Sequence, residues 1–153
     1  MWAEFAARYH IKDADYEAWA FGDDADGLAR LTLEGVKTAT SSAHPAYAWE
    51  GEPLPEAGEY SVILDSREEA VCVIRTERVY TAPFRDVDAE HARREGEGDL
   101  SLDYWRRVHE SFFARELADR GERFTPDMLV VCEEFRRVWP EDGGTPAPVE
   151  REG

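Results

Sequence analysis

The chain has 153 residues, enough for one domain with a real core, and its hydrophobic fraction of 42% fits a folded protein. Its formal net charge of −16 repels phosphate backbones at long range, which disfavours duplex DNA and tight non-specific nucleic-acid binding. No apolar run is long enough to span a membrane, and the N-terminus lacks a signal-peptide pattern. The two cysteines, Cys72 and Cys132, are too few for a disulfide framework or a zinc site. We therefore expect a cytoplasmic location.

The first 34 residues contain patterns that predict helices. Apolar side chains recur at helical spacing over residues 2–9, and the same spacing continues over residues 16–20. Acidic residues at positions 23–26 then open a further helix, because carboxylates are favourable at the positive end of a helix dipole. Gly35 is a typical helix-ending residue. We therefore expect N-terminal helices up to residue 34.

Most of the remaining chain predicts strands. The polar residues 37–42 are β-prone, and a proline-rich loop follows them. Apolar and β-branched runs then predict a hairpin, an extension of its second strand and a long closing strand: residues 60–65 with 71–76, residues 78–81 and residues 128–139. Before the closing strand we expect an aromatic helix over residues 101–119, capped by Asp99 or Ser101 and closed by Gly121.

The order of these elements indicates the fold class. Strand, hairpin, helix and closing strand without regular βα repeats indicate α+β. We expect a single domain over residues 1–139, in which residues 35–139 form a mostly antiparallel sheet that curls into a β-barrel surrounded by helices. From Pro140 onward the sequence is typical of a disordered tail, so residues 140–153 receive no role.

Lysine usage points to one candidate functional residue. The chain contains sixteen arginines but only two lysines, and one of these, Lys37, lies at the predicted helix-to-strand junction. An amine can lose its proton, whereas a guanidinium cannot, so a lysine that escapes the arginine bias suggests acid–base chemistry. The alternative is an ordinary exposed lysine placed there by chance.

Few other groups offer catalytic chemistry. The four histidines show no metal-like spacing, no glycine-rich phosphate loop precedes a helix, and no Gly-x-Ser-x-Gly nucleophile motif occurs. What remains is Lys37, the hydroxyls of residues 38–42 and three carboxylates at Glu95, Glu97 and Asp99. A regular strand would point Lys37 and Thr40 to opposite faces, so their cooperation requires a bulge or turn near residues 38–39.

Successive blocks of the sequence resemble those of a known family. The blocks are Gly35–Ser42, Gly58–Asp65, Val71–Thr76, Glu95–Leu102, Tyr104–His109, Ser111–Phe113 and Val130–Phe135. Together they resemble ASCH-domain proteins, whose fold is similar to the PUA barrel, and in particular a longer bacterial branch of that family. The resemblance covers about residues 16–139, most of the chain.

The resemblance implies one activity with named residues. Some short ASCH proteins are amidohydrolases that remove the acetyl group from N4-acetylcytidine with a Lys, a Thr three residues later and a Glu. The matching positions here are Lys37, Thr40 and Glu95. On this interpretation Thr40 attacks the amide carbonyl, Lys37 takes its proton, and Glu95 orients or relays, without a cofactor.

Two further activities stay open. One long-branch relative is reported as a metal-dependent ribonuclease on single-stranded RNA, which implies a divalent metal and matches at Lys37 and Ser111. The domain is also proposed as a non-catalytic RNA-binding module, which would use aromatic stacking and the three arginine pairs at residues 93–94, 106–107 and 136–137. The acidity of the chain favours a small ligand or a single flipped nucleotide over an extended RNA strand.

Nine further residues are predicted to bind RNA or a modified nucleoside: Tyr16, Trp19, Phe21, Ser41, Ser42, Arg94, Trp105, His109 and Ser111. The first three are extra aromatic residues that the short family members lack. Structural alternatives exist for several of these side chains. Trp105 belongs to the apolar stripe of its helix, and Glu95 could simply pair with Arg93 or Arg94. The sequence is compatible with a homodimer.

Overall fold

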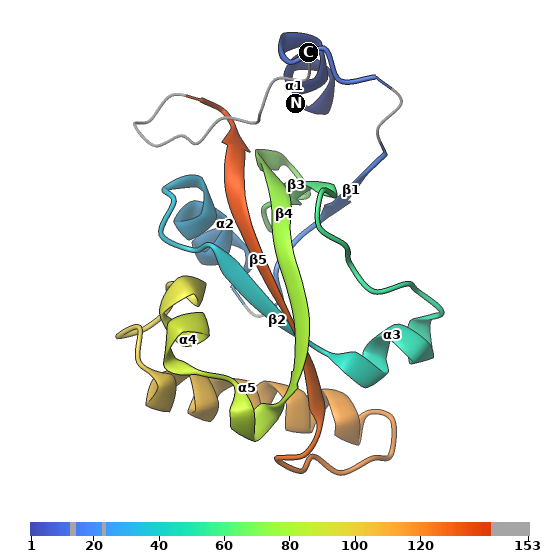
Figure 1. The fold of residues 1–153 in the computed structure, drawn as a ribbon, viewed down its shortest axis with the longest axis vertical. Coiled ribbons are helices and arrows are strands. Elements are labelled where there is room, and N and C mark those ends of the chain that lie inside the picture. Colours follow the sequence, from blue (N-terminus) through green and yellow to red (C-terminus); the bar gives the residue numbers. More distant parts are fainter. Residues whose placement is uncertain (13–14, 23, 142–153) are drawn as a thin grey trace.

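A computed structural model describes residues 1–12, 15–22 and 24–141 of the chain (Figure 1). Its elements follow in this order: α1 (Trp2–Arg8), β1 (Tyr16–Trp19), α2 (Ala25–Leu33), β2 (Ala39–Ala43), α3 (His44–Glu50), β3 (Tyr60–Leu64), β4 (Ala70–Pro83), the 3-10 helix η1 (Phe84–Asp86), α4 (Ala89–Glu95), α5 (Leu102–Ala118) and β5 (Leu129–Trp139). The predicted acid at position 23 and the predicted disordered tail from residue 142 lie outside the described residues. No helix within the described ranges has both the length and the apolar character to cross a membrane.

The five strands form one sheet in the order β1-β3-β4-β5-β2. β1 pairs with β3 in parallel, and the other neighbouring pairs are antiparallel. The α+β class and the mostly antiparallel sheet are therefore confirmed. The predicted closed barrel is wrong, because β1 and β2 are the two ends of the sheet and no pairing joins them in the described part of the chain. Closure needs paired edges, and here residues of both end strands instead form walls of a cavity.

The segment that contains Tyr16 is a strand, so the helix predicted for residues 16–20 is wrong. β1 pairs residue by residue with the first four residues of β3. The Tyr16 ring stacks on Trp2 of α1, with ring centroids 4.5 Å apart. The helical spacing of the aromatic residues was a local signal, and a partner strand far along the chain overrides it. The described residues among the first 34 therefore form two helices and a strand.

A short helix occupies part of the predicted proline-rich loop. α3 runs from His44 to Glu50 with Pro45 in its first turn, where a missing N–H removes no intrahelical hydrogen bond. Gly51 ends the helix with φ of 66°, a left-handed conformation that favours glycine. The proline that indicated a loop in the sequence thus starts a helix.

The predicted hairpin and closing strand are confirmed. β3 and β4 pair antiparallel, and β4 continues through the predicted extension as far as Pro83. β4 and β5 pair along most of their lengths, with register shifts near residues 73–74 and 76–78 that bend the sheet. Of the two predicted caps of the aromatic helix α5, Ser101 is the observed one, because its hydroxyl accepts from the backbone N–H of Tyr104.

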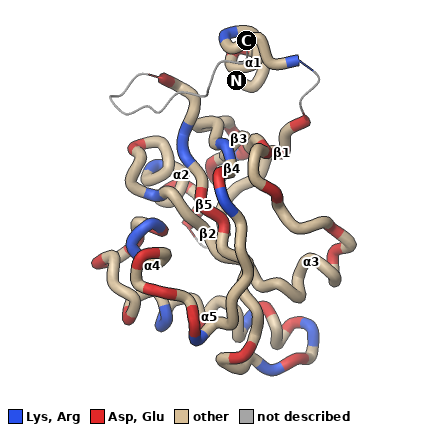
Figure 2. The backbone as a smooth tube through the Cα atoms, viewed as in Figure 1, with Lys and Arg blue, Asp and Glu red and all other residues tan. Residues whose placement is uncertain are grey.

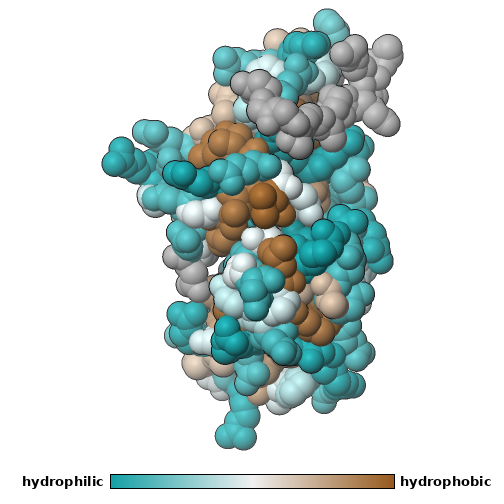
Figure 3. Space-filling model, turned by 90° about the vertical axis from the view of Figure 1, so that its left-hand side faces the viewer, coloured by the Kyte–Doolittle hydropathy of each residue, from teal (hydrophilic) through white to brown (hydrophobic). Residues whose placement is uncertain are grey.

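Helices cover the two ends of the long strands (Figure 1). α1 lies at one end, and α3, α4 and α5 gather at the other, with α2 beside the sheet between them. Each region has its own buried cluster, centred on Phe5 for α1, on Ile63 for α2, and on Trp105 and Phe113 for the remaining helices. On the side that carries α2 and α4, apolar residues gather in the middle of an otherwise hydrophilic face (Figure 3).

Both cysteines are packing residues. Cys72 and Cys132 are free, buried thiols inside β4 and β5. Burial raises the pKa of each thiol to about 12. A thiol with so high a pKa is a poor nucleophile at neutral pH, so neither residue is a candidate for the chemistry of the site.

Candidate functional site

Lys37 lies at the junction of α2 and β2, as predicted, but its side chain is only 1% exposed. After α2 the chain turns back, so that the N–H groups of Val36 and Lys37 both donate to the carbonyl of Leu31. β2 begins at Ala39, so Lys37 lies before the strand and outside its alternation with Thr40. This turn lies at residues 31–37, before the position near residues 38–39 where the sequence argument expected one. The alternative of an ordinary exposed lysine is wrong.

Oxygen atoms surround the Lys37 amine. Nζ lies 2.9 Å from the carbonyl oxygen of Ala39, 2.9 Å from Glu97 Oε2 and 3.3 Å from Glu95 Oε1. The carbonyl oxygen of Glu95 is 3.4 Å away, and the Phe21 ring centroid is 5.1 Å away. An ammonium carries three N–H donors, so each has an acceptor here. The two carboxylates supply the opposite charge that a buried cation needs.

Gly96 allows the two glutamates to approach Lys37. It ends α4 with φ of 73°, and a Cβ at this position would lie 2.7 Å from the carbonyl oxygen of Val36. The same turn is attached to the start of β2, because the N–H of Thr38 donates to the carbonyl of Arg94 at 2.7 Å. Backbone packing of α4 against the end of α2 therefore sets the distance between the amine and its carboxylate partners.

We expect Gly96→Ala to lower the free energy of unfolding by about 3 kcal/mol, because the left-handed φ and the clash with Val36 add. Urea unfolding followed by circular dichroism measures this loss. Gly121→Ala is the matched control: φ is also 73°, but no atom lies within 4 Å of the added Cβ. It should show only the backbone strain, about 1 kcal/mol. Equal losses in the two variants would contradict the role given to the Val36 contact.

Glu95 is a buried carboxylate with donors around both oxygens, and its side chain is 2% exposed. Three side chains donate to Oε2: the Ser41 hydroxyl, Trp105 Nε1 at 2.7 Å and His91 Nε2 at 2.9 Å. Oε1 lies 3.3 Å from Lys37 Nζ and 3.4 Å from His109 Nε2. Protein groups thus replace the whole hydration shell of this ion, which is the condition for burying a charge at tolerable cost.

These donors keep Glu95 ionised. Burial acts to raise the pKa of Glu95, but the charge of Lys37 and hydrogen bonds from His109 and His91 hold that pKa well below its usual value. Burial acts to lower the pKa of His109, but the hydrogen bond and charge of Glu95 prevail and raise that pKa. His109 Nδ1 donates to the carbonyl of Trp105 at 2.9 Å, which directs Nε2 to Glu95. Glu95 is therefore an electrostatic partner and a poor proton acceptor.

Ser41 and His91 lie close together without forming an activated nucleophile. The Ser41 hydroxyl is 2.7 Å from His91 Nε2. The same Nε2 faces Glu95 Oε2, which can only accept, so Nε2 carries the hydrogen and cannot take the serine proton. His91 Nδ1 is buried without a hydrogen-bond partner, whereas a catalytic triad needs a carboxylate there. The pair serves to bind Glu95.

A cavity of about 410 Å³, here named the lysine cavity, opens beside Lys37. Its polar lining comprises Lys37, Thr40, Ser41, Asp24, Glu95 and Glu97, and its rings are Phe21, Tyr104, His109 and Phe112. The Thr40 hydroxyl makes no hydrogen bond to another described side chain or backbone group. A volume of this size with a few polar groups among aromatic walls is typical of a small-molecule site.

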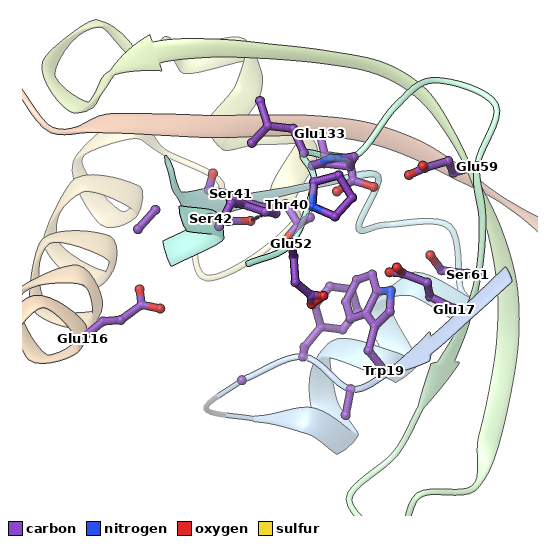
Figure 4. Close-up of a pocket in the computed structure, with 18 of the residues that line it drawn as sticks. Glu17, Trp19, Thr40, Ser41, Ser42, Glu52, Glu59, Ser61, Glu116 and Glu133 are labelled. Atoms are coloured by element: carbon purple, nitrogen blue, oxygen red, sulfur yellow. Dashed lines mark hydrogen bonds between the residues drawn. The ribbon is translucent and has the colours of Figure 1, made fainter. Parts of the chain in front are cut away.

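A larger cavity of about 680 Å³ is here named the glutamate cavity (Figure 4). It adjoins the lysine cavity, because the two share part of their lining. The residues that line both are Phe21, Gly22, Thr40, Ser41 and Phe112. The glutamate cavity lies between the open ends of the sheet, since Trp19 of β1 and Ser42 of β2 are both in its wall. Thr40 therefore stands where the two cavities meet.

The structure brings together the three residues predicted to be catalytic. Lys37, Thr40 and Glu95 all line the lysine cavity. Five of the predicted binding residues line one cavity or both: Phe21, Ser41 and His109 at the lysine cavity, and Trp19, Phe21, Ser41 and Ser42 at the glutamate cavity. The blocks of sequence that predicted these residues lie far apart in the chain and meet because α4 and α5 pack over the start of β2.

Four predicted binding residues line neither cavity, and their binding role stays a prediction: Tyr16, Arg94, Trp105 and Ser111. Tyr16 packs on α1, and Arg94 contacts Glu90 on its own helix at 3.0 Å. Trp105 is 2% exposed, donates a hydrogen bond to Glu95 and stacks on the His109 ring with centroids 4.4 Å apart. Ser111 is exposed on α5. A linear motif does not specify which face of a helix each residue occupies, so it does not predict which of its residues reach a cavity.

Two of the three arginine pairs contribute ion pairs, and they do so at separate places. Arg93 and Arg94 contact Glu90, so the alternative in which they neutralise Glu95 is wrong. Arg136 lies on β5 with Nε 3.6 Å from Glu77. The basic stretches of α4 and β5 do not meet (Figure 2). No shared phosphate site emerges from these two pairs.

Sequence reasoning missed several residues of the site. Glu97 was recognised as one of a group of carboxylates but received no role, and its contact with Lys37 depends on the turn at Gly96. His91 stands four residues before Glu95 on α4, a spacing that places both on one helix face and could have indicated their contact. Tyr104 and Phe112 lie within the family blocks of the sequence but received no role in the site.

The described residues offer no evident metal site. No group of three or more His, Cys, Asp or Glu side chains within them is arranged to hold a metal ion. The divalent metal of the ribonuclease alternative therefore stays a prediction without a ligand set in this part of the chain.

Comparisons with known proteins agree on one family. The ASCH domain model matches residues 17–139. An ASCH domain from Lactobacillus crispatus is 33% identical over 88% of this chain and 84% of its own, with a TM-score of 0.78. A protein from Enterococcus faecalis is 38% identical over 90% and 85% of the two chains, with a TM-score of 0.82. No curated protein matches the chain.

The open, mostly antiparallel sheet, the helices over its ends and the cavity at the start of β2 define a PUA-like α+β domain. The chain belongs to the ASCH domain family. The comparisons thereby confirm the family that the sequence blocks resembled. They do not assign an activity to the site.

Proposed function

We propose that this ASCH domain binds RNA or a modified nucleoside and hydrolyses an amide of the N4-acetylcytidine type in the lysine cavity. One observation supports this function above the others: a hydroxyl (Thr40), an amine (Lys37) and a carboxylate (Glu95) from separate parts of the chain line one cavity of about 410 Å³. The aromatic rings in the wall suit a stacked base, and the volume suits a nucleoside better than a strand.

The proposed first step is acyl transfer to Thr40. Its oxygen attacks the amide carbonyl while its proton passes to Lys37, and collapse of the adduct breaks the C–N bond as Lys37 returns the proton to the leaving amine. A water molecule then hydrolyses the threonine ester, which releases the carboxylic acid and restores the hydroxyl. The Thr40 side chain is suited to this role because no other described group holds its hydroxyl.

The base role of Lys37 requires a proton acceptor, since its amine donates to oxygen atoms on every side. Glu95 is a poor acceptor, because its pKa is held well below the usual value. Glu97 is the remaining candidate: Oε2 lies 2.9 Å from Nζ, and the side chain is 19% exposed at the cavity. Glu97 is therefore placed to relay a proton away from Lys37, and Glu95 holds the amine in position.

The non-catalytic alternative finds less support in the charges. Lys37 is the one lysine or arginine in the described lining of the lysine cavity, and two carboxylates already face it. A groove that follows an RNA backbone needs several cations along it. A single base or nucleoside needs none, which favours the small-ligand function.

The experiment is release of cytidine from N4-acetylcytidine, and Thr40→Val should lower its turnover number by at least about 10³-fold with unchanged stability. Thr38→Val is the matched control, because it removes a hydroxyl that donates to the carbonyl of Arg94 and does not line the cavity. RNA cleavage that a chelator abolishes would instead establish the nuclease. Binding without turnover, weakening steeply with salt, would establish a recognition module.

A further inference from the structure

The glutamate cavity is strongly acidic. Glutamates from two strands, a helix and a loop line it: Glu17, Glu52, Glu59, Glu116 and Glu133 (Figure 4). No lysine or arginine occurs among the described residues of its wall. The carboxylates approach from several sides of one hollow, so the cavity is a region of concentrated negative potential.

Two of these carboxylates are at least partly buried, and one of them has an oxygen without a hydrogen-bond partner. Glu116 Oε1 is buried without a hydrogen-bond partner. Glu133 is 8% exposed, and the Thr76 hydroxyl donates to its Oε2 at 2.7 Å. Buried polar groups are usually satisfied, and each exception calls for an explanation such as an absent ligand.

The electrostatics of these two residues agree with the geometry. Burial raises the pKa of Glu116, and the charge of Glu50 adds to this effect. Burial also raises the pKa of Glu133 against the hydrogen bond from Thr76, with Glu59 and Glu17 adding to the increase. A cation in the cavity would relieve both the desolvation and the mutual repulsion.

The walls indicate an organic cation. Trp19, Phe21, Tyr47 and Phe112 line the same cavity, and aromatic faces attract ammonium groups while they pack against alkyl chains. A bare metal ion would need oxygen ligands gathered at one point, and the described residues provide no such group. An aliphatic amine fits both the rings and the dispersed carboxylates.

We propose that the glutamate cavity binds an ammonium-bearing arm of the ligand whose amide lies at Thr40. This inference rests on the proposed function, because Thr40 and Ser41 line both cavities and connect the arm to the reacting group. The substrate class is thereby an amide whose acyl part carries a primary amine. Phosphorylated substituents are excluded from this cavity, because the glutamates would repel them.

Calorimetry with the inactive Thr40→Val protein tests the inference. The probes are N4-(aminohexanoyl)cytidine and N4-heptanoylcytidine, which differ only in an ammonium and a methyl group at the end of the chain. The aminohexanoyl probe should bind at least about tenfold more tightly. Adding Glu116→Gln should remove this preference. Adding Glu122→Gln, the same charge change at an exposed position outside the cavity, should preserve it.

The outcomes separate this inference from the proposed function. Equal affinity of the two probes would overturn the ammonium site and leave the hydrolase intact. If neither probe nor N4-acetylcytidine binds, the proposed function fails, and diaminohexane alone then tests the cavity. Diaminohexane binding that Glu116→Gln abolishes and Glu122→Gln preserves would uphold the ammonium site, and no binding would overturn it.

Discussion

Lys37→Met is expected to lower the free energy of unfolding by about 3–5 kcal/mol, because it removes the cation that faces a carboxylate 2% exposed to solvent. Methionine fills a similar volume, so the loss reports the missing charge more than a cavity. Glu95 keeps its contacts with His91, Trp105 and Ser41, but Oε1 loses its closest donor. Urea or guanidinium unfolding, followed by tryptophan fluorescence, measures the change.

The same variant should lose amide hydrolysis by about 10²–10⁴-fold in the turnover number, the usual contribution of a general base. Lys12→Met is the matched control, since it removes the only other lysine of the chain from an exposed position. Its stability should stay within about 0.5 kcal/mol of the wild type. A Lys37→Met protein as stable as the Lys12→Met protein would show that the amine is not required to compensate Glu95. Full activity in Lys37→Met would eliminate its role as base.

The parts of the fold that the sequence could predict depend on local signals. The β3–β4 hairpin and the strand β5 are runs of apolar and β-branched residues, and Ser101 and Asp24 are caps with a side-chain acceptor. The strand β1 could not be predicted, because its aromatic residues have helical spacing and only pairing with β3 makes them a strand. Whether the sheet closes depends likewise on contacts between distant ends.

The candidate site likewise has residues that the sequence could predict and contacts that it could not. The arginine bias of the chain singled out Lys37, and the family blocks added Thr40 and Glu95 as expectations. The burial of Lys37 could not be predicted, because it depends on the close approach of the Gly96 turn to the carbonyl of Val36. That approach also brings Glu97 to the amine. Distances of this kind follow from backbone packing between segments about sixty residues apart, as the contact of Lys37 with Glu97 illustrates.

Glu95→Gln tests the carboxylate itself, and we expect it to lower the free energy of unfolding by about 3–5 kcal/mol. The glutamine carbonyl can replace Oε2 and accept from Ser41, His91 and Trp105. Its amide group then takes the place of Oε1, so that N–H donors face the donors of Lys37 and His109. Glu134→Gln is the matched control, because Glu134 pairs at 3.0 Å with the exposed Arg78, and such surface pairs contribute about 0–1 kcal/mol.

The pH dependence of this difference follows from two opposite shifts. The pKa of Glu95 is lowered in the folded protein, so its contribution is present above the ordinary value of 4.5 and is lost as pH falls through the folded value. The pKa of His109 is raised by Glu95 against the effect of burial, so its contribution is complete below the ordinary value of 6.5 and is lost as pH rises through the folded value. The stability difference between wild type and Glu95→Gln should therefore be largest between pH 4.5 and 6.5. Unfolding curves from acid to alkaline pH measure it, and a difference that keeps growing above neutral pH would show that His109 does not take its charge from Glu95.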